Sequence, residues 1–290
     1  MKHRIAARLV AATSLLFVTL TVAAQEPAIK PSADLAGLAH VALRVHDLAA
    51  SVAFYGKLGF VNAFSLSRDG AVYEAFIKIN DRQFLELYPA TAKDPQIGFL
   101  HVCFEGSNLP SVHDYYVAHG LTPNDVRTAG AGNLLFTMPG PDTLTGPQNM
   151  EYTQYMPGSL HSKDFGQHLG ADRISTQLTA AAIAFTNPAA ASAFYQDKVG
   201  FIPHKLAPNS LSSVYAIPGA PEESIHIDSP ALGYKARITF AADPAKALAI
   251  LKLHVIPYTR GLGNSSIPEN STADVVITDP DGNEIILHRP

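Results

Sequence analysis

The 290-residue chain has little sulfur and few charges, and both shortages restrict what it can be. Cys103 is its only cysteine, so an intramolecular disulfide is excluded and the fold must be stabilised by packing. Charged residues make up 16% of the chain, and no basic patch of the kind found in nucleic-acid-binding proteins is present. A hydrophobic fraction of 47% is typical of a globular protein and excludes a disordered one.

Several motifs typical of known enzyme classes are also missing. The sequence contains no phosphate-binding loop, no HExxH zinc motif and no GxSxG nucleophile motif. Gly261 and Gly263 do not predict a dinucleotide site, because no third glycine follows and no strand is expected to lead into a helix there. Nucleotide-binding and hydrolase chemistry of these kinds is therefore not indicated.

One long apolar run is present, at the N-terminus. Leu9–Val22 is apolar and follows eight residues that carry three positive charges and no negative one. With small residues up to Ala24, this pattern predicts a signal peptide over residues 1–24, although an uncleaved anchor is the alternative. Cleavage would change the formal net charge from −4 to −7. We expect the mature protein in the periplasm or outside the cell.

An internal repeat organises the remaining sequence. Residues 53–60 read AFYGKLGF, and residues 193–201 read AFYQDKVGF. Before the first copy, residues 40–45 alternate between two faces, which predicts a half-buried strand. Asp47 is then expected to cap a helix that ends at Gly59.

The same order of elements recurs four times along the chain. Strand, helix and further strands are expected in units at about 38–89, 98–155, 175–228 and 234–288. The Pro/Gly-rich stretch 139–147 is expected to be a loop within the second unit. The predicted fold is α+β, with an N-terminal domain at 36–157, a linker at 158–172 and a C-terminal domain at 173–290.

These features together resemble a known superfamily. The four βαβββ units, the FY..LGF helix end and the closing DPDGNEIIL look like the vicinal oxygen chelate superfamily, over nearly all of residues 36–290. That group includes glyoxalase I, extradiol dioxygenases, fosfomycin-resistance enzymes, methylmalonyl-CoA epimerase and bleomycin-binding proteins. The resemblance implies that units pair into two cup-shaped, incompletely closed barrels and that a divalent metal is bound inside a cup.

The resemblance also implies where metal ligands should be, on the first and last strand of each unit. In the first pair of units these places hold His40, Glu86, His101 and Glu151. Strand alternation independently puts apolar residues such as Leu85 on the opposite face. A single strand His or Glu is usually an ordinary surface residue, but four in the four required places predict a metal site.

The second pair of units serves as a comparison. Alignment on the repeated tyrosine puts Ala180, His226, Ala236 and Ile286 in the four ligand places. Three of the four ligands are missing, so we expect a metal-free C-terminal domain with a structural task, such as covering the other domain. His226 alone is most simply an ordinary histidine.

Two imidazoles and two carboxylates suit one divalent ion, which could be Zn, Ni, Co, Mn or Fe(II). The pattern resembles glyoxalase I most closely, which implies a lyase or isomerase acting on a small carbonyl substrate, with Glu151 or Glu86 as the catalytic base. The alternatives are an Fe(II) extradiol ring-cleaving dioxygenase using His40, His101 and Glu151, and a non-catalytic protein that binds a small molecule or drug.

Other residues are assigned by strand face alone. The residues expected to point into the cup, and to contact substrate or pack its rim, are Arg44, Tyr88, Cys103, Thr153 and Tyr155. His161 follows a turn and is expected to be a surface histidine. The expected partner is a small-molecule substrate, and a homodimer stays open because family members pair units within one chain or between chains.

Overall fold

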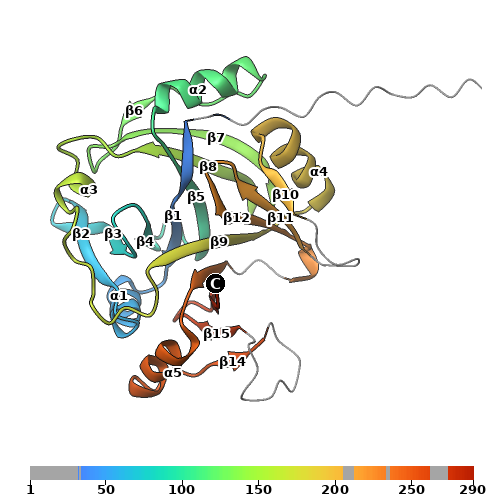
Figure 1. Cartoon of the computed structure of the whole chain (residues 1–290). Coiled ribbons are helices and arrows are strands. Elements are labelled where there is room, and N and C mark those ends of the chain that lie inside the picture. The colour runs from blue at the N-terminus through green and yellow to red at the C-terminus, as the bar shows by residue number, and fades with distance from the viewer. Residues whose placement is uncertain (1–31, 33, 205–211, 233–235, 262–273) are drawn as a thin grey trace, which may run out of the picture.

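In the computed structural model the chain forms two eight-stranded mixed sheets with few helices (Figure 1). The structure describes residues 32, 34–204, 212–232, 236–261 and 274–290. The predicted signal peptide lies outside the described residues. Within them, no helix combines the length and the hydrophobicity that crossing a membrane requires.

The first sheet contains the first two units in the strand order β2-β3-β4-β1-β5-β8-β7-β6. At its centre β1 pairs parallel with β4 and antiparallel with β5, and β5 pairs parallel with β8. Its elements are β1 (Leu35–Val45), α1 (Leu48–Lys57), β2 (Val61–Arg68), β3 (Ala71–Lys78), β4 (Phe84–Pro89), β5 (Gly98–Gly106), α2 (Leu109–Ala118), β6 (Arg127–Thr128), β7 (Leu134–Thr143) and β8 (Gly146–Gln154). The short helix α3 (Leu160–Lys163) follows in the predicted linker.

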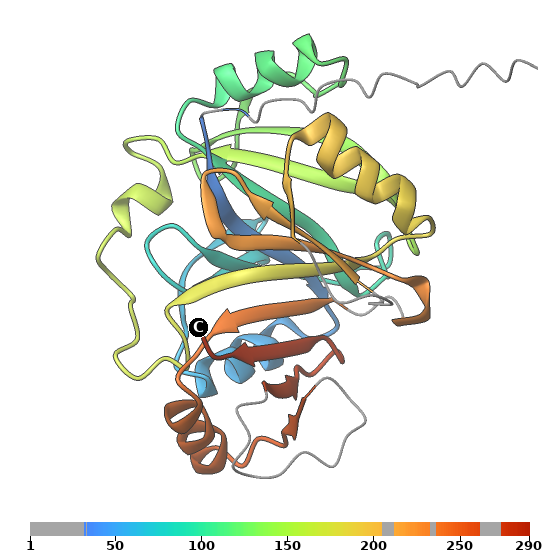
Figure 2. The same ribbon diagram turned by 45° about the vertical axis from the view of Figure 1, so that its right-hand side comes forward.

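The second sheet repeats this arrangement in the order β10-β11-β12-β9-β13-β16-β15-β14. Its elements are β9 (Gln177–Ala184), α4 (Pro188–Ala193), η1 (Phe194–Val199), β10 (Ile202–His204), β11 (Ser212–Ile217), β12 (Ala220–Asp228), η2 (Pro230–Leu232), β13 (Arg237–Ala241), α5 (Pro244–Leu253), β14 (Thr259–Arg260), β15 (Val275–Thr278) and β16 (Glu284–His288). The predicted α+β fold of four βαβββ units is therefore confirmed, and neither sheet closes into a barrel. Figure 2 shows the two sheets from a second direction.

Each unit starts its helix with a side-chain cap. Asp47 accepts a hydrogen bond from the Ala50 N–H at 3.0 Å, as the repeat predicted, and Asn108, Asn187 and Asp243 cap α2, α4 and α5 in the same way. These side chains satisfy N–H groups that a helix start leaves without partners. The caps explain why a helix begins shortly after the first strand in all four units.

The second copy of the repeat is one residue longer than the first, and the structure shows where that residue goes. Phe194–Val199 form the π-helical turn η1 inside the copy, whereas the first copy is an α-helix. Such a turn accommodates a single inserted residue within a helix. Gly200 then has a positive φ of 82°, as Gly59 has at 83°, so both copies end on the left-handed residue for which glycine is suited.

One loop prediction was wrong. The stretch 139–147 mostly belongs to the β7–β8 hairpin, where Pro139 pairs with Asn149 and Asp142 pairs with Pro147, with an irregularity between the two pairs. Proline is tolerated at such an irregularity because the strand ladder is already interrupted there. The composition alone therefore suggested a loop where the chain is extended.

The repeated tyrosine and phenylalanine join the two sheets. The Tyr55 hydroxyl donates to Asp279 Oδ2 at 3.1 Å, and the Tyr195 hydroxyl donates to Gln148 Oε1 at 2.9 Å. Both acceptors belong to the last hairpin of a unit in the other sheet. The rings of Phe60 and Phe240 lie 5.5 Å apart, and those of Phe104 and Phe201 5.2 Å apart, again one from each sheet. One continuous apolar core therefore includes residues of both sheets.

A buried polar cluster also connects the sheets. Glu223 Oε2 accepts from the Leu38 N–H at 2.5 Å, and Oε1 accepts from Gln83 Nε2 at 2.8 Å. Burial raises the pKa of Glu223 to about 7, with a further increase from the charge of Glu222 and an opposing effect of Arg82. Because this carboxyl holds its proton more tightly in the folded chain, its contribution to stability decreases as the pH rises through 7.

We therefore expect Glu223→Gln to flatten the pH dependence of stability between pH 5.5 and 8.5. The melting temperature of the wild type should fall by at least about 3 °C more than that of the variant over this interval. Thermal unfolding followed by circular dichroism at each pH measures the difference. Asp197→Asn, which alters an exposed carboxylate that does not act on Glu223, should keep the wild-type slope; parallel curves for Glu223→Gln and wild type would contradict the expectation.

Candidate metal centre

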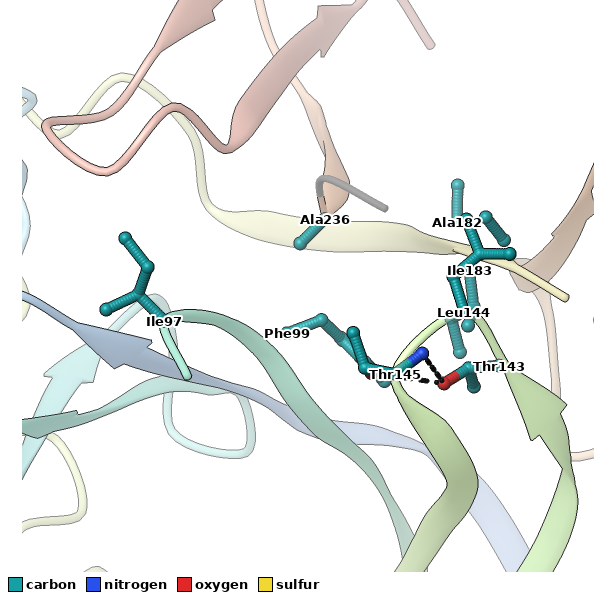
Figure 3. Close-up of a pocket in the computed structure, with 9 residues that line it drawn as sticks. Ile97, Phe99, Thr143, Leu144, Thr145, Ala182, Ile183 and Ala236 are labelled. Carbon is teal, nitrogen blue, oxygen red and sulfur yellow. Dashed lines mark hydrogen bonds between the residues drawn. The ribbon is translucent and has the colours of Figure 1, made fainter. Parts of the chain in front are cut away.

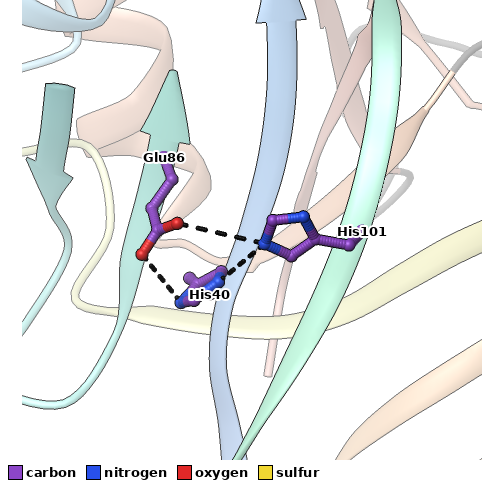
Figure 4. Close-up of side chains that lie close together, drawn as sticks. All are labelled: His40, Glu86 and His101. Atoms are coloured by element: carbon purple, nitrogen blue, oxygen red, sulfur yellow. Dashed lines mark hydrogen bonds and ion pairs between the residues drawn. The ribbon is translucent and has the colours of Figure 1, made fainter. Parts of the chain in front are cut away.

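All four predicted ligands come from the four central strands of the first sheet. His40 lies on β1, Glu86 on β4, His101 on β5 and Glu151 on β8, which are direct neighbours in the order β4-β1-β5-β8. Figure 4 shows the side chains of His40, Glu86 and His101 pointing toward one another. The face that carries these four side chains is called the ligand face below.

The ligand atoms lie close together. His40 Nδ1 lies 3.0 Å from Glu86 Oε1, and His40 Nε2 lies 3.1 Å from His101 Nε2 and 3.3 Å from Glu151 Oε1. His101 Nε2 lies 3.7 Å from Glu151 Oε2 and 3.9 Å from Glu86 Oε2. Thus each imidazole faces both carboxylates as well as the other imidazole.

This donor set fits a divalent ion. Ligand atoms bound at about 2.1 Å and at right angles stand about 3 Å from one another, close to the separation of the two imidazole nitrogens. Two carboxylates balance the charge of a divalent ion, and the side chains of His40 and Glu86 are only 3% and 5% exposed. Donor atoms lie close enough to hold an ion in two groups, which share His40: one adds Glu86 and His101, the other Cys103 and Glu151.

The two carboxyl groups differ in acidity. Burial, together with the charges of Glu74 and Glu151, raises the pKa of Glu86 well above its ordinary value. Burial also acts to raise the pKa of Glu151, but attraction to His101 and His40 outweighs it and the pKa falls to about 2. Burial lowers the pKa of His101 to about 4, so its ring is neutral at pH 7 and can act as a ligand. Glu151 is thus the ionised carboxylate, while Glu86 favours its protonated form.

Glu86 is supported by a network that the sequence analysis only partly anticipated. Tyr88, predicted as a substrate contact, shares its hydroxyl with Glu74 Oε1 at 2.6 Å and Glu86 Oε2 at 3.0 Å. Glu74 is buried on β3, two residues before Phe76, which pairs with Glu86, and it was not predicted. The alternation of Glu74 with Phe76 and Lys78 was visible in the sequence, but only strand pairing brings Glu74 to the ligand face.

The other residues that were predicted to contact substrate differ in burial and in their hydrogen-bond partners. Arg44 is half-buried and donates to the Gln96 carbonyl oxygen at 3.4 Å. Cys103 is fully buried beside His40 and Glu151, and burial raises its thiol pKa well above the ordinary value. Thr153 is also fully buried and donates to the Leu134 carbonyl oxygen at 3.0 Å. Their contact with substrate stays a prediction.

The expectation that His161 is a surface residue was wrong. It lies on α3 with 3% exposure, and its ring stacks on Tyr155, with ring centres 4.3 Å apart. The Tyr155 hydroxyl donates to the Arg82 carbonyl oxygen at 3.0 Å. Burial lowers the pKa of His161 to about 3, so the ring is neutral at pH 7. A histidine after a turn in a polar stretch carries no sequence signal of such burial.

Strand pairing in the second sheet shows that one of the four ligand counterparts aligned from the sequence is wrong. Ala42 pairs with His101, and the corresponding Ala182 pairs with Arg237. The counterpart of His101 is therefore Arg237 and not Ala236. The chain from this place to the last-strand place is one residue shorter in the fourth unit, at 286 − 237 = 49 against 151 − 101 = 50 in the second. The counterparts Ala180, His226 and Ile286 agree with the observed pairing.

The corresponding face of the second sheet borders a cavity of about 570 Å³ lined by Arg237, His226, Thr239 and Ile286 among others. Burial lowers the pKa of His226 to about 4, and the charge of Arg237 lowers it further in the same direction. Arg237 forms an ion pair with Asp228. Among the described residues, no group of three potential ligands converges on this sheet.

A much smaller cavity lies where the two sheets meet. Figure 3 shows Ile97, Phe99 and the Thr143–Thr145 turn facing Ala182 and Ile183 across it. Its volume is about 20 Å³, which is room for about one water molecule. This cavity is too small for a substrate.

Comparison with known proteins agrees with the geometry. Residues 37–149 match the family model of the Glyoxalase/Bleomycin resistance protein/Dioxygenase superfamily, as the sequence resemblance predicted. The search of curated proteins found no match.

Solved structures share the fold at low sequence identity. The Mn(II)-bound glyoxalase from Novosphingobium aromaticivorans has 16% identity and a TM-score of 0.64, over 88% of this chain and 82% of that one. The 2,3-dioxygenase LapB from Pseudomonas sp. KL28 has 15% identity and a TM-score of 0.63, over 89% and 93%. An extradiol ring-cleaving dioxygenase from B. fuscum has 15% identity and a TM-score of 0.62, over 90% and 74%.

We expect His101→Ala to abolish stoichiometric metal binding, because it removes one of two imidazoles from the donor set. His226→Ala changes a half-buried histidine on the second sheet and should leave the metal content unchanged. Elemental analysis of both purified variants after loading and desalting makes the comparison. Equal metal loss in the two variants would refute the assignment to the first sheet.

Tyr88→Phe should lower metal affinity by about 10- to 100-fold without removing a ligand, because Glu86 loses the hydroxyl that orients it. Competition with a chromophoric chelator measures this change. Tyr258→Phe, which alters a half-buried tyrosine on the second half of the chain, is the control. Unaltered affinity in Tyr88→Phe would mean that the hydroxyl does not orient Glu86.

Proposed function

Since residues 37–149 belong to the Glyoxalase/Bleomycin resistance protein/Dioxygenase superfamily, we propose that this protein is a divalent-metal-dependent enzyme of glyoxalase type. It would act as a lyase or isomerase on a small substrate whose oxygen atoms bind the metal. The observation that carries the proposal is the convergence of two imidazoles and two carboxylates from β1, β4, β5 and β8.

The metal, when bound, supplies a Lewis acid that polarises a substrate carbonyl and acidifies the neighbouring C–H. His40, His101 and Glu151 would hold it, with Glu86 as the fourth ligand. The neutral His101 ring and the ionised Glu151 are already in the protonation states that ligands require. Zn, Ni, Co, Mn and Fe(II) all suit this donor set.

Glu86 is the preferred base in this proposal. Metal ligands are deprotonated, so Glu86 would be ionised in the metal-loaded protein, and its raised pKa makes it the stronger base of the two carboxylates. Tyr88 holds Glu86 Oε2 in place, and Oε1, which faces His40 Nδ1 at 3.0 Å, would accept the proton from substrate and return it to the adjacent carbon. Burial of the site excludes water that would otherwise exchange with that proton.

A ring-cleaving dioxygenase is the second candidate, because His40, His101 and Glu151 alone make a set of two imidazoles and one carboxylate for Fe(II). In that case Glu86 would be a protonated neighbour of the metal rather than a ligand. The second carboxylate and its support by Tyr88 and Glu74 favour the glyoxalase-type proposal. The export of the protein, proposed from residues 1–24, is independent of either reaction.

We expect Glu86→Gln to lower turnover by at least about a hundredfold while part of the metal stays bound. Glu151→Gln should instead release most of the metal. The assay is proton exchange at the α-carbon of small hydroxy- and ketoaldehydes in D₂O, followed by NMR, together with metal analysis. Oxygen uptake with catechols under Fe(II), without proton exchange, would transfer the assignment to a dioxygenase. Metal binding without turnover on either substrate panel would leave a binding protein.

A further inference from the structure

The cavity of about 570 Å³ on the second sheet occupies the place that the candidate metal centre has on the first. Its lining includes the four residues in the ligand places of that sheet, which are Ala180, His226, Arg237 and Ile286. Cavities of about 300–1,000 Å³ are typical of sites that bind small molecules. The second half of the chain therefore offers space for a ligand, although no group of three potential metal ligands converges there among the described residues.

Small side chains keep this cavity open. Ser224 stands in the place of Phe84, because each pairs with the first ligand place of its half. Pro290 follows the last ligand place by four residues, as Tyr155 does in the first half. Ser224 and Pro290 both line the cavity, and no phenylalanine or tyrosine does so among the described residues. An aliphatic ligand body, rather than a stacked ring, suits these walls.

Arg237 supplies hydrogen-bond donors inside the cavity. Its side chain is 13% exposed, and its Nη2 forms an ion pair with Asp228 Oδ2. Asp228 Oδ1 accepts from the Ser212 hydroxyl, so both oxygens of this buried carboxylate are engaged. A guanidinium carries five N–H donors, and Asp228 is the one hydrogen-bond acceptor that Arg237 has among the described residues. The donors that remain can bind an oxygen atom of a ligand.

The charges along the lining disfavour a charged ligand. Arg237 carries a positive charge, and three carboxylates line the cavity with it: Asp228, Glu222 and Asp274. The carboxylates repel an anion, and the guanidinium repels a cation that approaches its N–H groups. An uncharged ligand with an oxygen acceptor meets neither repulsion.

Two histidines of the lining leave this balance unchanged. His226 is neutral at pH 7, because burial lowers its pKa to about 4, with a further decrease from the charge of Arg237. Its Nε2 lies 3.2 Å from the Ser224 hydroxyl oxygen. His288 Nδ1 lies 2.7 Å from Asp274 Oδ1, so that carboxylate compensates any charge on this ring. The centre of the cavity therefore presents neutral polar groups beside one compensated guanidinium.

We propose that this cavity is a second binding site, independent of metal, for an uncharged molecule with an aliphatic body and a carbonyl oxygen. The carbonyl oxygen accepts hydrogen bonds from Arg237, and the aliphatic body packs on Ala180, Ala182 and Ile286. The ion pair with Asp228 holds the guanidinium in position before the ligand arrives, which reduces the entropy lost on binding. The site goes beyond the proposed reaction, which belongs to the other sheet.

The test is isothermal titration calorimetry of the full chain after a chelator has removed any metal. Octanamide, octanoate and octylammonium serve as probes, because they have the same number of carbon atoms and differ in charge. We expect octanamide to bind at one site per chain with a Kd below about 1 mM. It should bind at least about tenfold more tightly than either charged probe.

Two variants change the cavity directly, and a third is the control. Ser224→Phe introduces the ring that the first half has at this place and should weaken octanamide binding at least about tenfold. Arg237→Met removes the donors and should weaken it by a similar factor, provided that its melting temperature shows a folded protein without the Asp228 ion pair. Ser224→Phe retains that pair and is decisive by itself. Ser67→Phe adds the same ring at an exposed position of β2 and should leave binding unchanged.

Absence of octanamide binding to the wild type overturns the proposal, and so does unaltered binding by Ser224→Phe in a folded protein. Equal or tighter binding of octanoate or octylammonium overturns the uncharged ligand class. Zinc titration of the same wild-type protein separates this result from the proposed function, because octanamide binding requires no metal on the first sheet. Octanamide binding without zinc binding would contradict the metal assignment alone, and the reverse would contradict the second site alone.

Discussion

The arrangement of the first half depends on the burial of two carboxyl groups on one sheet face. Glu86 and Glu151 come from strands that do not touch each other, and β1 and β5 between them supply His40 and His101. Burying two carboxylates costs free energy unless a positive charge balances them. In the absence of one, Glu86 favours its protonated form, whereas a divalent ion would compensate both groups. The same constraint accounts for the Tyr88 hydroxyl shared with Glu74.

The repeated FY motif serves the pairing of the two halves rather than the chemistry. Tyr55 and Tyr195 each reach a hairpin of the other sheet, and Phe60 and Phe201 each pack on a phenylalanine there. The interface is thus made twice, by equivalent residues in opposite directions. This explains why the motif is also present in the second half, where three of the four ligand places hold other residues.

Local patterns in the sequence were sufficient for the four units and the Asp47 cap, because alternation and spacing act within one strand or helix. The four candidate ligands followed from the resemblance to the superfamily. Local patterns were insufficient wherever the outcome depends on pairing between strands. Glu74 reaches the ligand face because Phe76, two residues on along the same strand, pairs with Glu86. Arg237 stands in place of Ala236 because the chain from there to the last strand is one residue shorter than in the second unit. The burial of His161 depends on side chains from three strands and one helix, which no local pattern contains.

Because of Arg237, the electric charge at the equivalent sites of the two halves depends differently on the solution. A guanidinium stays protonated at any physiological pH and is covalently part of the chain, so the positive charge beside His226 is permanent. In the proposed function, the first half instead takes its balancing charge from solution, as a divalent ion. Metal scarcity or a strong chelator would therefore alter the electrostatics of one half of the molecule and leave those of the other unchanged.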